Sequence, residues 1–281
     1  MKVNSNLRNI FFSTVFIEAF KEDGTRVTGT GFTYLVGTQE KPIPLLVTAR
    51  HVISEAATGS IRFMVSDGSG GPRLGQAITR QYADFKNHWY QHPDSEVDIA
   101  VKSALNELLP PAGSEDDAPF FRLVDSSLCP TQEQVDTLDL LEEVTFVGYP
   151  AGLYDTANYT PVMMQGVAAT PIEIDWHHRP VFLINAPVVS GLSGSPVFTI
   201  GDGMFRERGG VRVIGNRVLF LGVLTGGYQV SETGTMTSGD AQSTFSFMNK
   251  LSLGAVHKWT AVADTIDRFL HDLDKAPGGG M

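Results

Sequence analysis

Gly191-Leu192-Ser193-Gly194-Ser195-Pro196-Val197 places a serine between glycines, just before an apolar segment. A serine hydroxyl is a weak nucleophile until a base takes its proton and hydrogen-bond donors stabilise the oxyanion that forms. The flanking glycines allow a turn in which backbone N–H groups converge on one point. The same heptad is also typical of an ordinary turn that leads into a strand, so a catalytic interpretation requires a base elsewhere.

A candidate base and a candidate acid each lie at the end of an apolar strand-like run. His51 ends the run that begins at Leu45, whereas the other six histidines lie in polar segments or near the C-terminal helix. By itself, His51 is also compatible with a core histidine. The acid has four candidates, but one of them leads directly into an apolar run and would be half-buried, which requires a partner. The four are Asp84, Asp94, Glu96 and Asp98, and Asp98 is the one followed by Ile99-Ala100-Val101.

Most of the chain consists of short apolar or alternating runs separated by turn residues, with 29 Gly and 15 Pro among 281 residues. One series of such runs lies before the acidic, turn-rich segment Pro110–Ala118, and a second begins near Val144. Regularly spaced short strands of this kind predict an all-β fold. Residues 257–273 differ, because their apolar positions recur with helical spacing, which predicts a C-terminal helix docked on the body.

Composition excludes several classes of function. The 31 acidic and 21 basic residues give a formal net charge of −10, which disfavours nucleic acids and anionic membranes as partners. Cys129 is the single cysteine, so the chain has neither an internal disulfide nor a multi-cysteine metal site. No apolar run reaches the roughly 18 residues of a membrane helix. We interpret Ile10–Phe20 as a strand and not as a signal peptide, and we expect a cytoplasmic protein.

Three segments together resemble the trypsin-like (chymotrypsin-fold) serine proteases, of the bacterial, HtrA-like type that has no disulfides. Val47-Thr48-Ala49-Arg50-His51 is similar to the family's Thr-Ala-x-His segment, Asp98-Ile99-Ala100-Val101 to its Asp-Ile-Ala-Leu strand, and Gly191 to Pro196 to its nucleophile loop. The order His, Asp, Ser differs from the orders found in subtilisins and in α/β-hydrolases. The resemblance covers roughly residues 10 to 255.

The resemblance implies two six-stranded antiparallel Greek-key β-barrels with the active site between them. We therefore expect an N-terminal barrel over residues 1–109 with His51 and Asp98, and a C-terminal barrel over 142–254 with Ser193. Residues 110–141 would link the barrels, and residues 255–281 would form a helix and a tail.

The function implied is a serine endopeptidase with a His51–Asp98–Ser193 triad and an acyl-enzyme intermediate. Backbone N–H groups of Gly191 and Ser193 would form the oxyanion hole. We expect no metal or cofactor, and we expect a small or apolar residue before the cleaved bond, because no acid lies in the segments that would form the pocket. The substrate-binding residues implied by the resemblance are Pro187, Ser190, Leu192, Thr225, Gly226 and Gly227.

Two further expectations concern the use of this site. The partner is expected to be a peptide or protein substrate, and a regulatory protein that gates the activity is a second expected partner. Asp67–Gly75 and Tyr149–Thr160 are the candidate gating loops, because both are long and rich in turn residues. The alternative function is a catalytically silent protease fold that serves as a peptide-binding or scaffold module.

Overall fold

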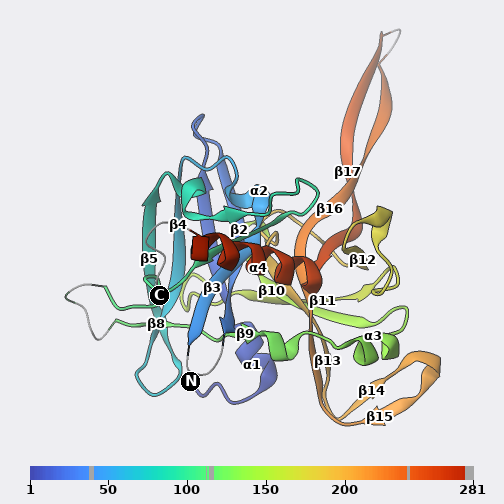
Figure 1. Cartoon of the computed structure of the whole chain (residues 1–281). Helices are drawn as coiled ribbons and strands as arrows, with labels where there is room; N and C mark the ends of the chain where they lie inside the picture. The colour runs from blue at the N-terminus through green and yellow to red at the C-terminus, as the bar shows by residue number, and fades with distance from the viewer. Residues whose placement is uncertain (38–40, 112, 114–116, 239–240, 276–281) are drawn as a thin grey trace.

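The computed structural model describes residues 1–37, 41–111, 113, 117–238 and 241–275. It confirms the predicted all-β class and the C-terminal helix (Figure 1). Most described strands belong to two bodies that lie side by side, one from each half of the chain, and helix α4 crosses both. Among the described helices, none is long and apolar enough to cross a membrane.

The N-terminal half, for which a six-stranded antiparallel barrel was expected, forms a nine-stranded sheet with the order β5-β4-β1-β2-β3-β7-β6, in which β8 pairs with β4 and β9 pairs in parallel with β2. The predicted linker over 110–141 is therefore partly built into this sheet, since it supplies β8 and β9; its residues 112 and 114–116 lie outside the described residues. The reason is apolar burial, because Phe120 of β8 packs against Phe12 and Met64. The bounds are β1 Thr14–Phe20, β2 Arg26–Gly37, β3 Pro42–Ala49, β4 Thr58–Ser66, β5 Pro72–Ala83, β6 Tyr90–Gln91, β7 Ile99–Ser103, β8 Pro119–Phe120 and β9 Val124–Asp125, with α1 Asn6–Phe11, α2 Arg50–Ile53, η1 Phe85–His88 and η2 Ser126–Leu128.

The C-terminal half forms the predicted six-stranded closed barrel, in the order β10-β11-β12-β17-β16-β13. A separate two-stranded sheet, β14 and β15, is inserted between β13 and β16. The bounds are β10 Glu143–Gly148, β11 Val162–Ala168, β12 Val181–Asn185, β13 Ser195–Gly201, β14 Met204–Arg206, β15 Arg212–Ile214, β16 Arg217–Ser238 and β17 Ala241–Lys258, with α3 Gln132–Thr137, η3 Pro150–Gly152, η4 Trp176–His178 and η5 Arg208–Gly210.

Helix α4 (Trp259–Lys275) seals the junction between the two halves. Its buried face, with Ala261, Val262 and Ile266, joins a cluster that contains Phe32 from the N-terminal sheet and Phe220 from the barrel. The apolar stripe predicted from the sequence is therefore covered by the chain's own core. The helix begins two residues later than predicted, because His257 and Lys258 still pair as part of β17. The tail at 276–281 lies outside the described residues.

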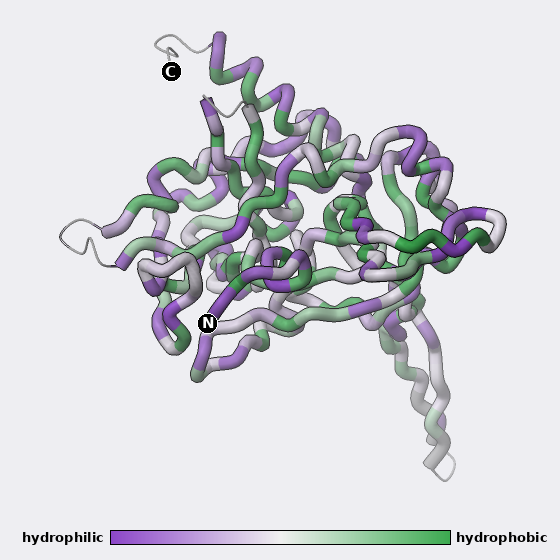
Figure 2. Tube along the Cα trace, turned by 90° about the horizontal axis from the view of Figure 1, so that it is seen from below, coloured by the Kyte–Doolittle hydropathy of each residue, from purple (hydrophilic) through white to green (hydrophobic). Residues whose placement is uncertain are grey.

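Strands β16 and β17 continue well beyond the barrel as a two-stranded hairpin. Their pairing runs from Gly222↔Lys258 to Ser238↔Ala241, with bulges near Gly226 and Tyr228. The hairpin projects from the body in both views (Figures 1 and 2). Only short strands were predicted in this region, so the length of the hairpin is a finding of the structure.

Candidate active site

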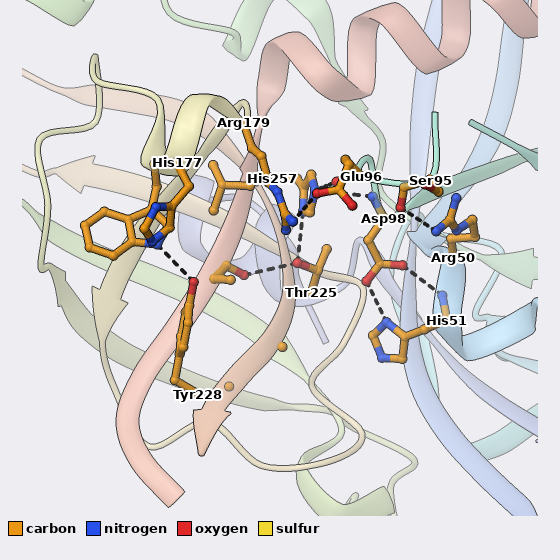
Figure 3. A pocket seen from close by; sticks show the side chains of 15 residues that line it. Arg50, His51, Ser95, Glu96, Asp98, His177, Arg179, Thr225, Tyr228 and His257 are labelled. Atoms are coloured by element: carbon orange, nitrogen blue, oxygen red, sulfur yellow. Dashed lines mark hydrogen bonds and ion pairs between the residues drawn. The ribbon is translucent and has the colours of Figure 1, made fainter. Parts of the chain in front are cut away.

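Strand pairing places Asp98 beside His51. Strands β3 and β7 pair with Ala49 opposite Ile99, so the next residues, Arg50 and Asp98, also meet, and the Arg50 N–H donates to the Asp98 carbonyl at 3.2 Å. His51 follows in the first turn of α2 and turns its ring back to the Asp98 carboxylate (Figure 3). The Asp98 Oδ2 lies 2.7 Å from His51 Nδ1, and Oδ1 accepts the His51 backbone N–H at 2.9 Å. The carboxylate therefore fixes both the ring and its backbone.

The other ring nitrogen of His51 faces the nucleophile loop. Its Nε2 lies 2.9 Å from Ser193 Oγ, so a carboxylate, an imidazole and a hydroxyl are aligned in series. Ser193 is only 9% exposed, whereas the His51 side chain is 48% exposed. One face of the imidazole is therefore open to a substrate while the hydroxyl is held in place. The single cysteine, Cys129, contacts Tyr34 instead and is not the nucleophile of this site.

Two glycines allow the conformation of the nucleophile loop. Gly191 and Gly194 have φ values of +87° and +93°, a region that L side chains rarely adopt. A Cβ on Gly191 would lie 2.2 Å from the Tyr149 carbonyl oxygen, and one on Gly194 would lie 1.8 Å from the Thr30 carbonyl oxygen. Within the described part of the chain, the backbone N–H groups of Gly191 and Ser193 donate to no protein acceptor. Both N–H groups are therefore free to donate to a bound acceptor, as the prediction of an oxyanion hole requires.

Thr30 on β2 attaches the nucleophile loop to the N-terminal sheet. Its N–H donates to the Ser193 carbonyl at 2.8 Å, and its Oγ1 donates to the Gly191 carbonyl at 2.8 Å. The same Oγ1 accepts the Tyr149 N–H at 3.2 Å. Thr30 could not be identified from the sequence, because a threonine within a β-branched strand carries no local sign of this contact. The two halves of the site are thus joined by hydrogen bonds at the loop itself.

His257 at the end of β17 supports Asp98 from behind and was also missed. The Asp98 N–H lies 3.2 Å from His257 Nε2, and His257 Nδ1 lies 2.9 Å from Thr225 Oγ1. Nε2 also lies 3.1 Å from the Glu96 carbonyl oxygen. We assign the ring proton to Nδ1, because Nε2 can accept the part-buried Asp98 N–H only when it carries no proton. Burial lowers the pKa of the His257 imidazole, which favours this neutral form. Figure 3 shows the ring between Thr225 and the Glu96–Asp98 segment.

Two cavities flank the aligned groups. A cavity of about 400 Å³ is bordered by His51, Asp98 and His257 and by the aromatic pair Trp176 and Tyr228, whose side chains share a 3.0 Å hydrogen bond. A second cavity, of about 270 Å³, is bordered by Ser193 and by the base of the hairpin. Its lining residues are Val188, Val189, Ser190, Ser193, Gly226, Gly227, Tyr228, Gln229 and Lys250.

Of the six residues predicted to bind substrate, four line one or both of these cavities and two do not. Gly226 and Gly227 line both cavities, Thr225 lines the first and Ser190 the second. The side chain of Leu192 is fully buried in the barrel core and lines neither cavity. Pro187 is exposed but lies outside the linings of these two cavities, where Val188 and Val189 stand instead. The described residues contain no cluster of three or more His, Cys, Asp or Glu suited to a metal ion.

Solved structures similar to this chain include three proteases. The active form of the Rv3671c protease from M. tuberculosis is 18% identical, with 94% of this chain and 84% of that chain covered and a TM-score of 0.44. HL collagenase is 12% identical, with coverage of 94% and 95% and a TM-score of 0.46. Catalytically active tobacco etch virus protease in complex with product is 11% identical, with coverage of 81% and 73% and a TM-score of 0.45. The curated proteins contain no match to this chain.

A comparison with protein-family models shows the family of this chain. The model described as the trypsin-like peptidase domain matches residues 29–205, which is more than half of the chain. The matched region contains His51, Asp98 and Ser193, and it extends from β2 through β13 to β14. This chain therefore belongs to the family of trypsin-like peptidase domains.

Proposed function

We propose that this protein is a serine endopeptidase that cleaves peptide bonds through Asp98, His51 and Ser193. The observation that carries the proposal is the series of two contacts, 2.7 Å from carboxylate to imidazole and 2.9 Å from imidazole to hydroxyl. A nucleophile, its base and the group that orients the base are the minimal set for acyl transfer. The free N–H groups of Gly191 and Ser193 add the oxyanion donors that the reaction needs.

Each group has a defined role in the proposed reaction. Ser193 Oγ attacks the scissile carbonyl carbon while His51 Nε2 takes the hydroxyl proton, and the carbonyl oxygen moves toward the two free N–H groups. His51 then gives that proton to the leaving amine, and a water molecule repeats the sequence on the acyl-enzyme. Asp98 stays ionised and keeps the proton of the neutral imidazole on Nδ1, so that Nε2 is available to Ser193.

The second cavity supports a small or apolar residue before the cleaved bond. Val188, Val189, Gly226 and Gly227 give it apolar and open walls, and its lining contains no carboxylate among the residues that the structure describes. Lys250 is the one charged side chain in that described lining, and its ammonium group would repel a lysine or arginine of the substrate. This specificity and the roles of the individual site residues are parts of the proposal.

A regulatory partner stays a prediction. Of the two candidate loops, the one over 149–160 contacts the nucleophile loop directly, since the Ala151 N–H donates to the Ser190 carbonyl at 2.5 Å. Binding at this loop could therefore move the oxyanion donors without touching Ser193.

The test of the proposed function is a cleavage profile. Purified protein and the Ser193→Ala variant are incubated with an unfolded protein and with a peptide mixture, and new termini are identified by mass spectrometry. We expect new termini with the wild type alone, with small or apolar residues preceding the cleaved bonds. Binding of the peptides without any cleavage would favour the scaffold alternative, and cleavage after Lys or Arg would contradict the proposed pocket.

A further inference from the structure

The hairpin extends the edge of β16 that begins beside Ser193. Strand β13 pairs with β16 only as far as Ser195↔Leu224, and from there to Ser238 the described pairs of β16 are with β17 alone. The edge starts where Ser193 Oγ lies 3.4 Å from the Thr225 carbonyl oxygen. An unpaired strand edge is a template for another extended chain. In this molecule that template continues from the candidate nucleophile out to the hairpin.

One face of the hairpin is apolar at this edge. Gly234 lies opposite Phe245, and a Cβ on Gly234 would be 2.5 Å from the tip of the Phe245 ring. The ring therefore lies over β16 toward its free edge. Val230 and Met236 are on the same face, because side chains two residues apart on a strand point the same way. Val230 is 39% exposed, Met236 63% and Phe245 50%.

The opposite face is mainly hydroxylic. Thr233 and Ser246 meet there, with their hydroxyl oxygens 3.5 Å apart, and Met248, which lies opposite Ser231, shares this face. On the apolar face, Glu232 is bound by the Asn249 side chain at 2.7 Å. Among the described residues of the hairpin, Glu232 and Lys250 are the charged side chains, one of each sign. Its chemistry fits an extended polypeptide with apolar side chains at alternate positions, and it does not fit a polyanion.

We propose that Val230, Gly234, Met236 and Phe245 form a hairpin site that binds the substrate upstream of the cleaved bond. This inference rests on the proposed protease function and deepens it. A chain added antiparallel to β16 has its C-terminal end at Thr225, next to Ser193, so the residues before the scissile bond lie along the hairpin. Residues 229–236 of β16 span about 26 Å at roughly 3.3 Å per residue. The segment bound is therefore about eight residues long, and its substrate class is an unfolded or extended polypeptide.

The test compares three fluorogenic peptides that share one cleavage site. The first covers six residues around the bond, the second adds eight alternating valine and serine residues on the N-terminal side, and the third adds the same eight on the C-terminal side. We expect kcat/KM of the N-extended peptide to exceed that of the short one about tenfold, which corresponds to about 1.4 kcal/mol. A gain confined to the C-extended peptide, or no gain from either extension, overturns the proposal.

Matched variants test whether the gain in kcat/KM arises at the hairpin site. Phe245→Ser and Met236→Ser are expected to reduce the ratio of N-extended to short activity toward one, whereas Met248→Ser, on the opposite face, keeps the ratio. Activity on the short peptide reports whether the body of each variant is intact. Equal loss of the ratio in all three variants would contradict a site on one face.

A binding measurement separates this inference from the proposed function. Fluorescence anisotropy with the labelled N-extended peptide and the Ser193→Ala protein requires no catalysis. Tighter binding than the short peptide, abolished by Phe245→Ser in the same background, supports the hairpin site even if no peptide is cleaved. Equal binding of both peptides overturns it. Sedimentation that shows a dimer lost in Phe245→Ser, together with equal peptide binding, would assign the face to a second copy of this chain.

Discussion

The corner around Ser193 and the hairpin that begins beside it are built in opposite ways. At the corner, the groups that position Asp98, His51 and Ser193 come from both halves of the chain and are buried and hydrogen-bonded, as Thr30 and His257 illustrate. On the hairpin, the side chains are exposed and, among the described pairs, the outer edges of both strands have no partner strand. Reactive groups must be held in a fixed geometry by several contacts, whereas binding of an extended chain requires an unpaired strand edge. We therefore expect changes at the corner to affect turnover strongly and changes on the hairpin to affect selection moderately.

Removing the proposed nucleophile is expected to have the largest effect. Ser193→Ala leaves the binding surfaces intact but removes the atom that would form the acyl-enzyme in the proposed mechanism, so kcat should fall on the order of 10⁶-fold, the scale known for a Ser-His-Asp triad. Steady-state cleavage of a short peptide measures this. If the variant kept a tenth of the activity, another residue would be the nucleophile.

Asp98→Asn comes next, with an expected loss of about 10⁴ in kcat. The amide can donate to His51 Nδ1 and so place the imidazole proton on Nε2, where it blocks proton transfer from Ser193. The KM for a short peptide should change little, since Asp98 does not hold substrate in the proposed mechanism. Asp94→Asn is the matched control, because Asp94 lies in the same loop outside the series of contacts. Equal losses in both variants would argue against a specific role for Asp98.

Thr30→Val tests whether the two halves of the site are held together at the loop. The substitution keeps the shape but removes a hydroxyl that donates to Gly191 and accepts from Tyr149. We expect a loss of about 1–3 kcal/mol in the free energy of unfolding and a decrease of roughly 10²-fold in kcat from the displaced loop. Urea unfolding and peptide cleavage measure the two. Thr28→Val, two residues earlier on β2, should have little effect on either.

The smallest effect expected at the corner is the contribution of His257 to the change of protein stability with pH. Burial lowers the pKa of this imidazole below its ordinary value of 6.5, so the unfolded chain takes up a proton first as the pH falls. Unfolding then binds a proton, and stability decreases from about pH 6.5 down to the folded-state pKa. His257→Gln removes this contribution, so urea midpoints should fall less between pH 7.5 and 5 in the variant. The same pH dependence in both proteins would mean that folding does not shift the pKa of His257.

The three triad candidates could be predicted from the sequence because each lies in a local pattern. His51 and Asp98 stand at the ends of apolar runs, and Ser193 is flanked by glycines. Thr30 and His257 could not, because their contacts join residues about 160 positions apart. His257 was predicted to lie at the start of the C-terminal helix, whereas pairing with Val181 keeps it in β17.

The pocket and the hairpin show a second limit of the sequence. Leu192 and Pro187 were predicted to contact substrate, yet Val188 and Val189 line the cavity, since the turn before Ser193 decides which side chains face inward. The hairpin is rich in Gly, Ser and Thr and so resembles a loop in the sequence. The length of the hairpin is therefore apparent only from the pairing of β16 with β17 in the structure.

The most direct test of the central claim is covalent labelling of Ser193. Wild type, Ser193→Ala and Asp98→Asn are treated with a fluorophosphonate, which reacts with activated serines, and each is weighed by intact mass spectrometry. The account predicts one adduct on the wild type, located on Ser193, none on Ser193→Ala and much slower labelling of Asp98→Asn. An unlabelled wild type, or an adduct that persists in Ser193→Ala, would contradict the assignment of Ser193 as an activated nucleophile.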